Sequence, residues 1–322
     1  MDRRRIVGIG LGALAGAAYG TGPLFFKGYV YPVGVDWIAM LVWRFAFATL
    51  VSWIWLFVQP RARESLRGLD RRTVARLLFT GAFFIVNASV YYAAIEQIDI
   101  SLVALLMSAY PALVAVLSLR LGYKFEGKLA WGSLAIVVFG TVLTIGGVNP
   151  GTSQGGIVLA LLSPVAYAVY ILLTAWMAGE RPGQTADMRS RGKGAEVPPP
   201  VAGAIMMTGT WVAALVIGLV AREPLLPTQI PSAAWPGLVG IGVFAAAIAI
   251  QAFYASAARI GAAQASLTAT VEPVVVIILG ITFLGEAFSP IRAVGAAVVL
   301  AGVLLAQFAT PSEYRPVVLE EP

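Results

Sequence analysis

The chain has 322 residues, of which 59% are hydrophobic and 12% are charged, with a formal net charge of +6. This composition is typical of an integral membrane protein and excludes a soluble globular domain. The absence of His and Cys excludes a histidine proton relay, imidazole or thiolate metal sites, disulfides and a Ser-His-Asp triad. We therefore expect no cofactor and no metal.

Ten apolar segments follow one another along the chain, and together they predict an all-α polytopic membrane protein, because roughly 20 residues cross a bilayer as a helix. The expected segments are 6–26, 36–58, 74–95, 99–120, 130–147, 156–177, 203–221, 235–257, 262–284 and 291–309.

The first segment follows the basic sequence MDRRR and contains AGAAYG, so a secretory signal peptide is one interpretation. We favour a permanent helix, because the segment has a counterpart in the second half. Its glycines recur every four residues, and adding 148 to their numbers leads again to small residues or proline: Gly8, Gly12, Gly16 and Gly20 match Gly156, Ala160, Pro164 and Ala168. A stripe of small residues at this spacing predicts close helix packing.

The stretch from Ala262 to Glu286 carries Glu272 and Pro273 near the middle of an apolar segment. A carboxylate there costs on the order of 2–4 kcal/mol, so it should face protein or a cavity. Subtracting 162 places Pro273 over Pro111 and Glu272 over Tyr110. Because proline cannot donate a helical hydrogen bond, we expect kinks, and possible hinges, at both prolines.

The matched segments predict a 5+5 repeat, with residues 1–150 as the first copy and 151–309 as the second. Five helices are an odd number, so the second copy is inverted. The polar stretch 178–202 is expected to be a loop inside the second copy, and 310–322 a polar tail.

The distribution of Lys and Arg predicts that both termini are cytoplasmic. With this orientation 18 basic residues lie on the inner side and only 3, Lys27, Arg222 and Arg292, on the outer side, while Arg44 lies within a span. The basic residues form no patch with interleaved aromatic residues, so we expect no nucleic-acid partner. The expected partners are the bilayer and a small-molecule substrate, with a monomer as the default state.

The inverted repeat, the central prolines and the sequence FLGE at Phe283–Glu286 resemble the drug/metabolite transporter superfamily, EamA type. The first copy departs from the family ending, with RLGYKFE at Arg120–Glu126. The resemblance implies a secondary carrier with alternating access in the bacterial inner membrane. Many relatives export amino acids, one branch aromatic ones. A second branch exchanges nucleotide sugars or phosphorylated sugars, for which we expect several buried basic residues.

Glu272 is the first candidate for the substrate site, with Gln264 and Thr268 on the same predicted helical stripe. It could bind a substrate amine or a proton, or it could be a structural carboxylate that is paired with Arg44 or bonded to backbone opened by a proline. Arg44 could bind a substrate carboxylate, pair with Glu272, or extend its guanidinium outward to the membrane surface, the last being favoured.

Further candidates are polar or aromatic residues on symmetry-related helices: Asn87, Tyr91, Gln251 and Tyr254, with Tyr19, Trp43, Tyr110, Tyr167 and Tyr170 as stacking surfaces. For each amide alone, an interhelical hydrogen bond of about 0.6 kcal/mol explains it as well. The charged residues at expected helix ends, Lys27, Asp36, Glu286 and Arg292, are interpreted as solvated caps.

The leading hypothesis is a secondary transporter that exports amino acids, aromatic or other neutral ones, with no enzymatic activity. A membrane-embedded enzyme would need a second intramembrane carboxylate or a nucleophile elbow, and an ATP-driven pump a G-x-x-x-x-G-K-[ST] loop; the sequence has none of these. A receptor or assembly factor that uses the same fold without transport is the alternative from another class.

Overall fold

The computed structural model describes residues 3–110, 113–114, 117, 128–146, 151–177, 197–260, 265, 268–287 and 289–309. Every regular element among them is helical, as predicted, and the chain is an all-helical polytopic membrane protein. The helices are α1 (Arg3–Phe25), α2 (Trp37–Val58), α3 (Pro60–Arg67), α4 (Arg71–Gln97), α5 (Ile100–Met107), α7 (Lys128–Gly146), α8 (Gln154–Met177), α10 (Pro199–Ala221), α11 (Trp235–Gly242), α12 (Ala249–Ile260), α14 (Val271–Leu284) and α15 (Pro290–Ala309).

Six stretches of these helices are long and apolar enough to span a membrane, namely Arg3–Val33, Trp37–Val58, Arg71–Gln97, Gln154–Leu173, Pro200–Ala221 and Ser232–Phe253. Three shorter apolar helices, Trp131–Ile145, Val271–Leu284 and Pro290–Leu305, accompany them. The long first span continues from α1 through a π-helical turn at Phe26–Val30 and a 3-10 turn at Tyr31–Val33. The amphipathic α3 was not among the expected segments.

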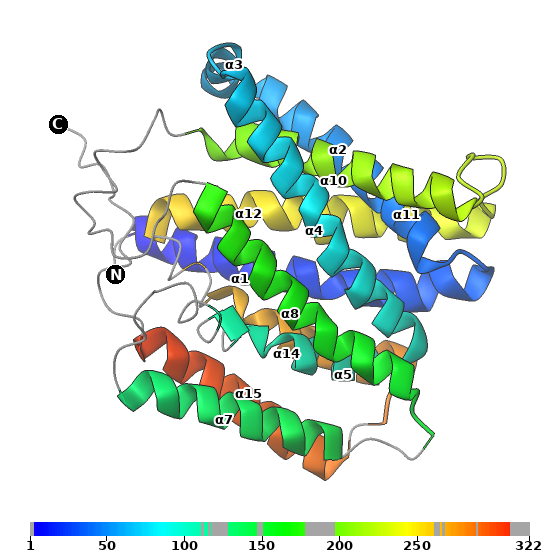
Figure 1. Ribbon diagram of the computed structural model, residues 1–322, viewed down its shortest axis with the longest axis vertical. Coiled ribbons are helices and arrows are strands. Elements are labelled where there is room, and N and C mark those ends of the chain that lie inside the picture. Colours follow the sequence, from blue (N-terminus) through cyan, green and yellow to red (C-terminus); the bar gives the residue numbers. More distant parts are fainter. Residues whose placement is uncertain are drawn as a thin grey trace.

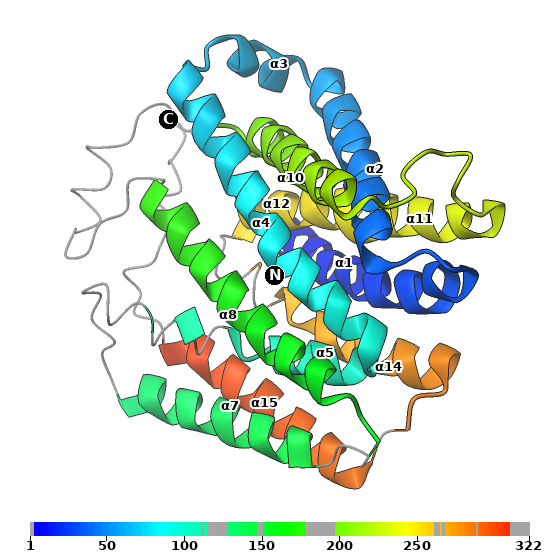
Figure 2. The same cartoon turned by 45° about the vertical axis from the view of Figure 1, so that its right-hand side comes forward.

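The helices form two groups around a central pair. In Figures 1 and 2, α1 and α12 lie side by side in the middle, and α11 continues the line of α12. The helices α2, α4 and α10 lie above them, and α5, α8 and α14 lie below. The last helix of each predicted repeat, α7 and α15, packs as a pair along the lower edge.

Glycine contacts repeat with the same offsets as the sequence, and this supports the internal symmetry. A Cβ atom on Gly8 would clash with Ile260, and one on Gly156 would clash with Ile98. The offset of 148 relates Gly8 to Gly156, and the offset of 162 relates Ile98 to Ile260. A Cβ on Gly140 would likewise meet Val299, and one on Gly302 would meet Val137, each pair mirroring the other. Small residues therefore set equivalent helix crossings in both halves.

The penultimate span is broken next to Pro273, where the sequence predicted a kink. The helix α14 begins at Val271, so Pro273 lies in its first turn, where a missing N–H costs no helical hydrogen bond. The carbonyl of Ala269 instead points at Gly16 of α1, where a Cβ would clash with it. A one-residue break at Thr270 thus separates the helical residues Thr268 and Ala269 from α14, and Pro111 lies outside the described residues.

The charged residues at helix ends are only partly the solvated caps that the sequence predicted. Asp36 is a cap, since its Oδ1 accepts from the N–H groups of Ile38 and Ala39, both at 3.0 Å. Arg292, in contrast, is 1% exposed and pairs with Asp99. Lys27 and Glu286 also bind backbone groups of other helices. The solvated interpretation is therefore wrong for three of the four.

The crossing of α7 and α15 provides a matched test of the packing. Gly140→Leu should destabilise the protein by about 1–3 kcal/mol, because a Cβ there would lie 2.7 Å from the Val299 backbone nitrogen. Gly132→Leu on the same helix should be close to neutral, because nothing lies within 4 Å of its Cβ position. Thermal unfolding in detergent compares the two, and equal stability of both variants would contradict the assigned crossing.

The loop after α10 gives a pH-dependent prediction. Partial burial and the neighbouring carboxylate of Asp36 raise the pKa of Glu223 above its ordinary value. A carboxyl group whose pKa is raised on folding destabilises the folded state once the pH exceeds that pKa. Glu223→Gln should therefore raise the Tm at pH 7 to 8, and this gain should vanish below the ordinary carboxyl pKa. A gain that is unchanged at low pH would exclude this cause.

Candidate functional site

The two groups of helices enclose a cavity of about 420 Å³, within the usual range for small-molecule sites. Its walls are mostly aromatic and aliphatic and come from both halves of the chain. It is lined by Tyr19, Pro23, Arg44, Gly81, Phe84, Asn87, Ala88, Tyr91, Tyr92, Ala104, Met107, Ser108, Tyr110, Tyr167, Tyr170, Ile171, Met206, Met207, Thr210, Ile250, Phe253, Ala269, Thr270, Glu272, Pro273, Leu300 and Val303.

Many of the lining residues are related by the repeat offsets of 148 and 162. The related pairs on the wall are Tyr19 and Tyr167, Pro23 and Ile171, Arg44 and Met206, Ala88 and Ile250, Tyr91 and Phe253, Met107 and Ala269, Ser108 and Thr270, and Tyr110 and Glu272. Equivalent positions of the two repeats therefore line one cavity. The acidic and the basic lining residue, Glu272 and Arg44, each have a neutral counterpart in the other repeat.

Arg44 points into the protein, which contradicts the outward orientation favoured from the sequence. Its side chain lies on α2 and is 9% exposed. One guanidinium nitrogen donates to the Tyr92 hydroxyl, and the other donates at 3.4 Å to the carbonyl of Ala245 in the π-helical turn Val243–Ile248. The guanidinium carbon also lies 4.9 Å from the Tyr92 ring centroid, and Nε is buried without a hydrogen-bond partner.

Glu272 lines the same cavity from the first turn of α14. The positive end of a helix dipole favours a negative charge at this position. Close contact with α1 holds the turn in place, since a Cβ on Gly20 would lie 3.1 Å from the Glu272 carbonyl oxygen. No ion pair joins Glu272 to Arg44, although the structure describes both side chains. The expected alternative of a structural pair with Arg44 is therefore absent in this conformation.

Four aromatic rings form a continuous wall of the cavity. The ring centroids of Tyr110 and Tyr167 are 4.8 Å apart, and those of Phe84 and Tyr170 are 5.1 Å apart. Tyr167 and Tyr170 stack at 5.8 Å. Aromatic rings at these distances and tilts attract one another, and together they present a rigid apolar surface.

The other sequence candidates divide into three groups. Asn87 lines the cavity, where its Oδ1 accepts from Ser163 at 3.1 Å. Thr268 and Gln251 are not among the lining residues. The Thr268 hydroxyl donates to the Ala265 carbonyl at 2.9 Å and lies beside Gly12. Trp43 packs instead against Trp235, with ring centroids 4.7 Å apart.

Gln264 and the side chain of Tyr254 lie outside the described residues.

The sequence analysis missed several lining residues, among them Tyr92, Phe84 and Met206. Met206 could have been found, because the offset of 162 places it over Arg44. Tyr92 could also have been found, because the same offset places it over the candidate Tyr254. Phe84 gives no such signal, since aromatic residues inside spans are usually core or interface residues.

The comparison with protein families matches this chain twice. A model described as the EamA-like transporter family covers residues 6–146 and 154–308, which is nearly the whole chain.

Curated relatives carry transporter names. The "Uncharacterized inner membrane transporter YedA" of Escherichia coli (strain K12) is 25% identical over 283 residues, covering 86% of this chain and 84% of the relative. The "Uncharacterized transporter YcbK" of Bacillus subtilis (strain 168) is 25% identical over 277 residues, covering 83% and 82%. An "Uncharacterized transporter" of Archaeoglobus fulgidus is 23% identical over 278 residues, covering 86% and 89%.

A solved structure, named only "Crystal structure of protein", superposes with a TM-score of 0.63 at 16% identity. It covers 96% of this chain and 99% of its own. At this identity the likeness concerns the fold alone.

The stability of the fold should depend on the planar guanidinium of Arg44 and not on its positive charge alone. Arg44→Lys keeps the charge but loses the planar donor pair that serves Tyr92 and Ala245. We expect a loss of about 1.5–3 kcal/mol, the usual value for hydrogen bonds to charged groups. Thermal unfolding in detergent measures it, with the exposed Arg76→Lys on α4 as the control. An unchanged Tm in Arg44→Lys would show that these bonds do not stabilise the fold.

Proposed function

The chain belongs to the EamA-like transporter family, and we propose that it exports amino acids with aromatic or other apolar side chains by alternating access. It is a membrane transporter, and the substrate class is the step that we add. We place it in the bacterial inner membrane with both termini in the cytoplasm, because this orientation puts 18 of 22 basic residues on the inner side.

The observation that carries the proposal is the pair of opposite charges that face one cavity without neutralising each other. Arg44 retains a buried N–H without a partner, and Glu272 has no ion pair with it. A zwitterion offers a carboxylate for the guanidinium and an ammonium group for the carboxylate, so its binding would satisfy both charges. A substrate with only one charge would leave the other unsatisfied.

The repeat counterparts of the two charged residues support an apolar side chain on the substrate. Arg44 corresponds to Met206, and Glu272 corresponds to Tyr110. The head group would then bind at the charged positions, while the side chain contacts Met206, Tyr110 and the aromatic wall. Stacking and burial of an aromatic side chain are favourable on such a surface.

The cavity also argues against the second branch of the superfamily. Nucleotide sugars and phosphorylated sugars carry fixed negative charges that require several basic partners. Among the described lining residues Arg44 is the one basic side chain. We therefore rank sugar-phosphate exchange second.

Counterflow in proteoliposomes tests the proposal. We expect saturable exchange of tryptophan, phenylalanine or another neutral amino acid. Glu272→Gln should raise the half-saturating concentration about 10-fold or more, since a lost charge-assisted bond is worth about 1.5–3 kcal/mol. Glu64→Gln, at an exposed position on α3, is the matched control and should be unchanged.

Substrate analogues assign the two charges. Phenylethylamine lacks the carboxylate, so it should compete equally well in the wild type and in Arg44→Gln. Phenylpropionate lacks the amine, so it should compete equally well in the wild type and in Glu272→Gln. Exchange of phosphorylated sugars but of no amino acid would reject the substrate class and keep the transporter. If nothing is exchanged, the receptor or assembly alternative is favoured.

A further inference from the structure

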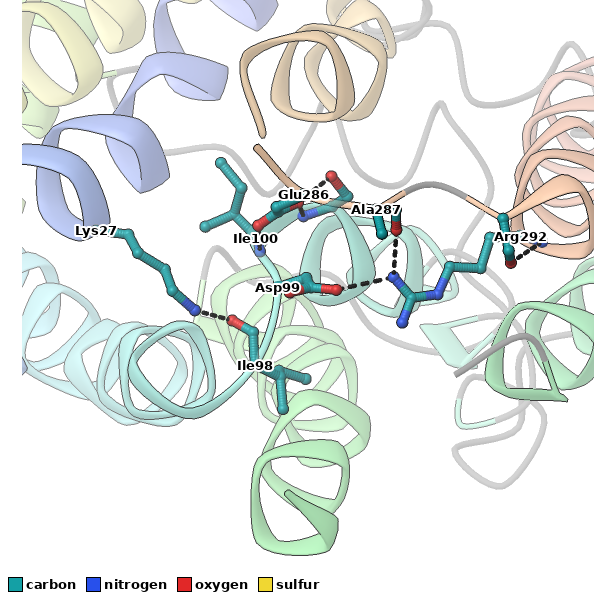
Figure 3. Close-up of polar contacts among 9 residues, drawn as sticks. Lys27, Ile98, Asp99, Ile100, Glu286, Ala287 and Arg292 are labelled. Carbon is teal, nitrogen blue, oxygen red and sulfur yellow. Dashed lines mark hydrogen bonds and ion pairs between the residues drawn. The ribbon is translucent and has the colours of Figure 1, made fainter. Parts of the chain in front are cut away.

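The two repeats also meet at the end of the molecule opposite the N-terminus, away from the cavity. Figure 3 shows Asp99, Ile100, Glu286 and Arg292 at this contact, and Ser101 and Gly280 pack against Glu286 there. We call the contact the far-end seam: Asp99, Ile100 and Ser101 from the first repeat, and Gly280, Glu286 and Arg292 from the second. Glu286 follows the end of α14, where Gly285 adopts a φ of 66° and turns the chain toward α5.

Glu286 caps a helix of the other repeat. Its Oε1 accepts from the Ile100 N–H at 2.5 Å, and its Oε2 accepts from the Ser101 N–H at 3.1 Å and from the Ser101 hydroxyl. These are the first N–H groups of α5, which have no partner within their own helix. A carboxylate is also favourable at this positive helix end.

The residue that would ordinarily cap α5 is engaged elsewhere. Asp99 occupies the N-cap position, where aspartate is among the preferred residues, but its side chain makes no capping hydrogen bond. Its Oδ2 accepts instead from Arg292 at 2.8 Å, and the same Arg292 nitrogen donates to the Ala287 carbonyl at 3.2 Å. The ion pair with Arg292 of the second repeat therefore keeps Asp99 from capping α5.

The packing around the seam is tight and leaves little room for other arrangements. A Cβ on Gly280 would lie 2.5 Å from Glu286 Oε2 and 2.7 Å from the Ser101 hydroxyl. Lys27 holds the preceding helix, since its Nζ donates to the carbonyls of Ile95 and Ile98 at the end of α4. Opposite charges thus sit at the two helix ends that flank Asp99, each with the sign that the helix dipole favours.

The symmetry-related positions do not carry this chemistry. The offset of 162 places Gly261 over Asp99, Ala263 over Ser101, Lys124 over Glu286 and Ala130 over Arg292. Neither the ion pair nor the acidic cap is repeated in the sequence, and a lysine is unfavourable at a helix N-terminus. The ion pair and the acidic cap are therefore features of one end of the sequence repeat only.

We propose that the far-end seam is a gate that opens by an exchange of helix caps, a step that rests on the alternating access of the proposed function. When the repeats separate here, Glu286 and Arg292 leave together because both belong to the second repeat. Asp99 is released by the same movement and caps α5. An N-cap side chain accepts from the second or third N–H of its helix, as Asp36 does from Ile38 and Ala39. The Ser101 N–H therefore keeps an acceptor in both states, while the Ile100 N–H is left to water when the gate opens.

A cysteine in the cavity reports the opening without any transported substrate, so the result is independent of the substrate class. The chain contains no cysteine, and Ser108 lines the cavity at the end of α5. Ser108→Cys is labelled with a membrane-impermeant maleimide in vesicles of each orientation. The rate of labelling from the far-end side measures how often the gate is open.

Asp99 variants separate cap exchange from a simple ion pair. Asp99→Asn loses the ion pair but can still cap α5, so labelling from the far-end side should rise several-fold. Asp99→Ala loses both and should raise it less, because the open state is now destabilised as well. Equal or faster labelling in Asp99→Ala would reject cap exchange, and no increase in either variant would reject the gate.

Two further variants keep the test sound if one protein folds poorly. Arg292→Gln removes the ion pair by changing the basic partner. It should also speed labelling, because the released Asp99 can then cap α5 in place of Glu286. Arg222→Gln removes a positive charge from an exposed position at the same end and should leave the rate unchanged. A rise in Arg222→Gln equal to that in Arg292→Gln would show a general surface effect and overturn the proposal.

Discussion

The close approach of α1 to the start of α14 is the constraint on which the candidate site depends. Glycines on one face of α1 leave room for backbone rather than side chains, so the carbonyls of Ala269 and Glu272 lie where Cβ atoms would otherwise stand. This contact places the first turn of α14 in the centre of the molecule. A carboxylate can therefore be presented to the cavity from the positive end of a helix instead of from a helix middle.

The internal symmetry builds the cavity, and departures from it supply its chemistry. Repeat-related residues line both walls, which is what an inverted repeat around a central site requires. Arg44 corresponds to Met206 in the other repeat, and Glu272 corresponds to Tyr110. The far-end seam follows the same rule, because its charged residues have neutral or basic counterparts. In both places a shared backbone arrangement carries different side chains, and function is expected where the copies diverge.

The sequence predicted helix content, symmetry and several lining residues, but it misplaced others for identifiable reasons. Thr268 and Glu272 would share a helical face only if the helix were continuous, and the structure begins a new helix at Val271. Gln251 follows the π-helical turn Val243–Ile248, and such a turn shifts the helical face of everything after it. Ile250 and Phe253 line the cavity instead. Local breaks of this kind depend on tertiary packing, which a regular period does not record.

The sequence by itself determined the membrane setting, the helical class and the repeat, because apolar length and the spacing of small residues and prolines are properties of the chain alone. The direction of each long side chain was decided only by the tertiary structure. Arg44 turns inward because Tyr92 and the Ala245 carbonyl offer acceptors, and Arg292 is buried because Asp99 lies opposite it. A buried charge takes the orientation in which partners satisfy it, and those partners are 48 to 201 residues away in the chain.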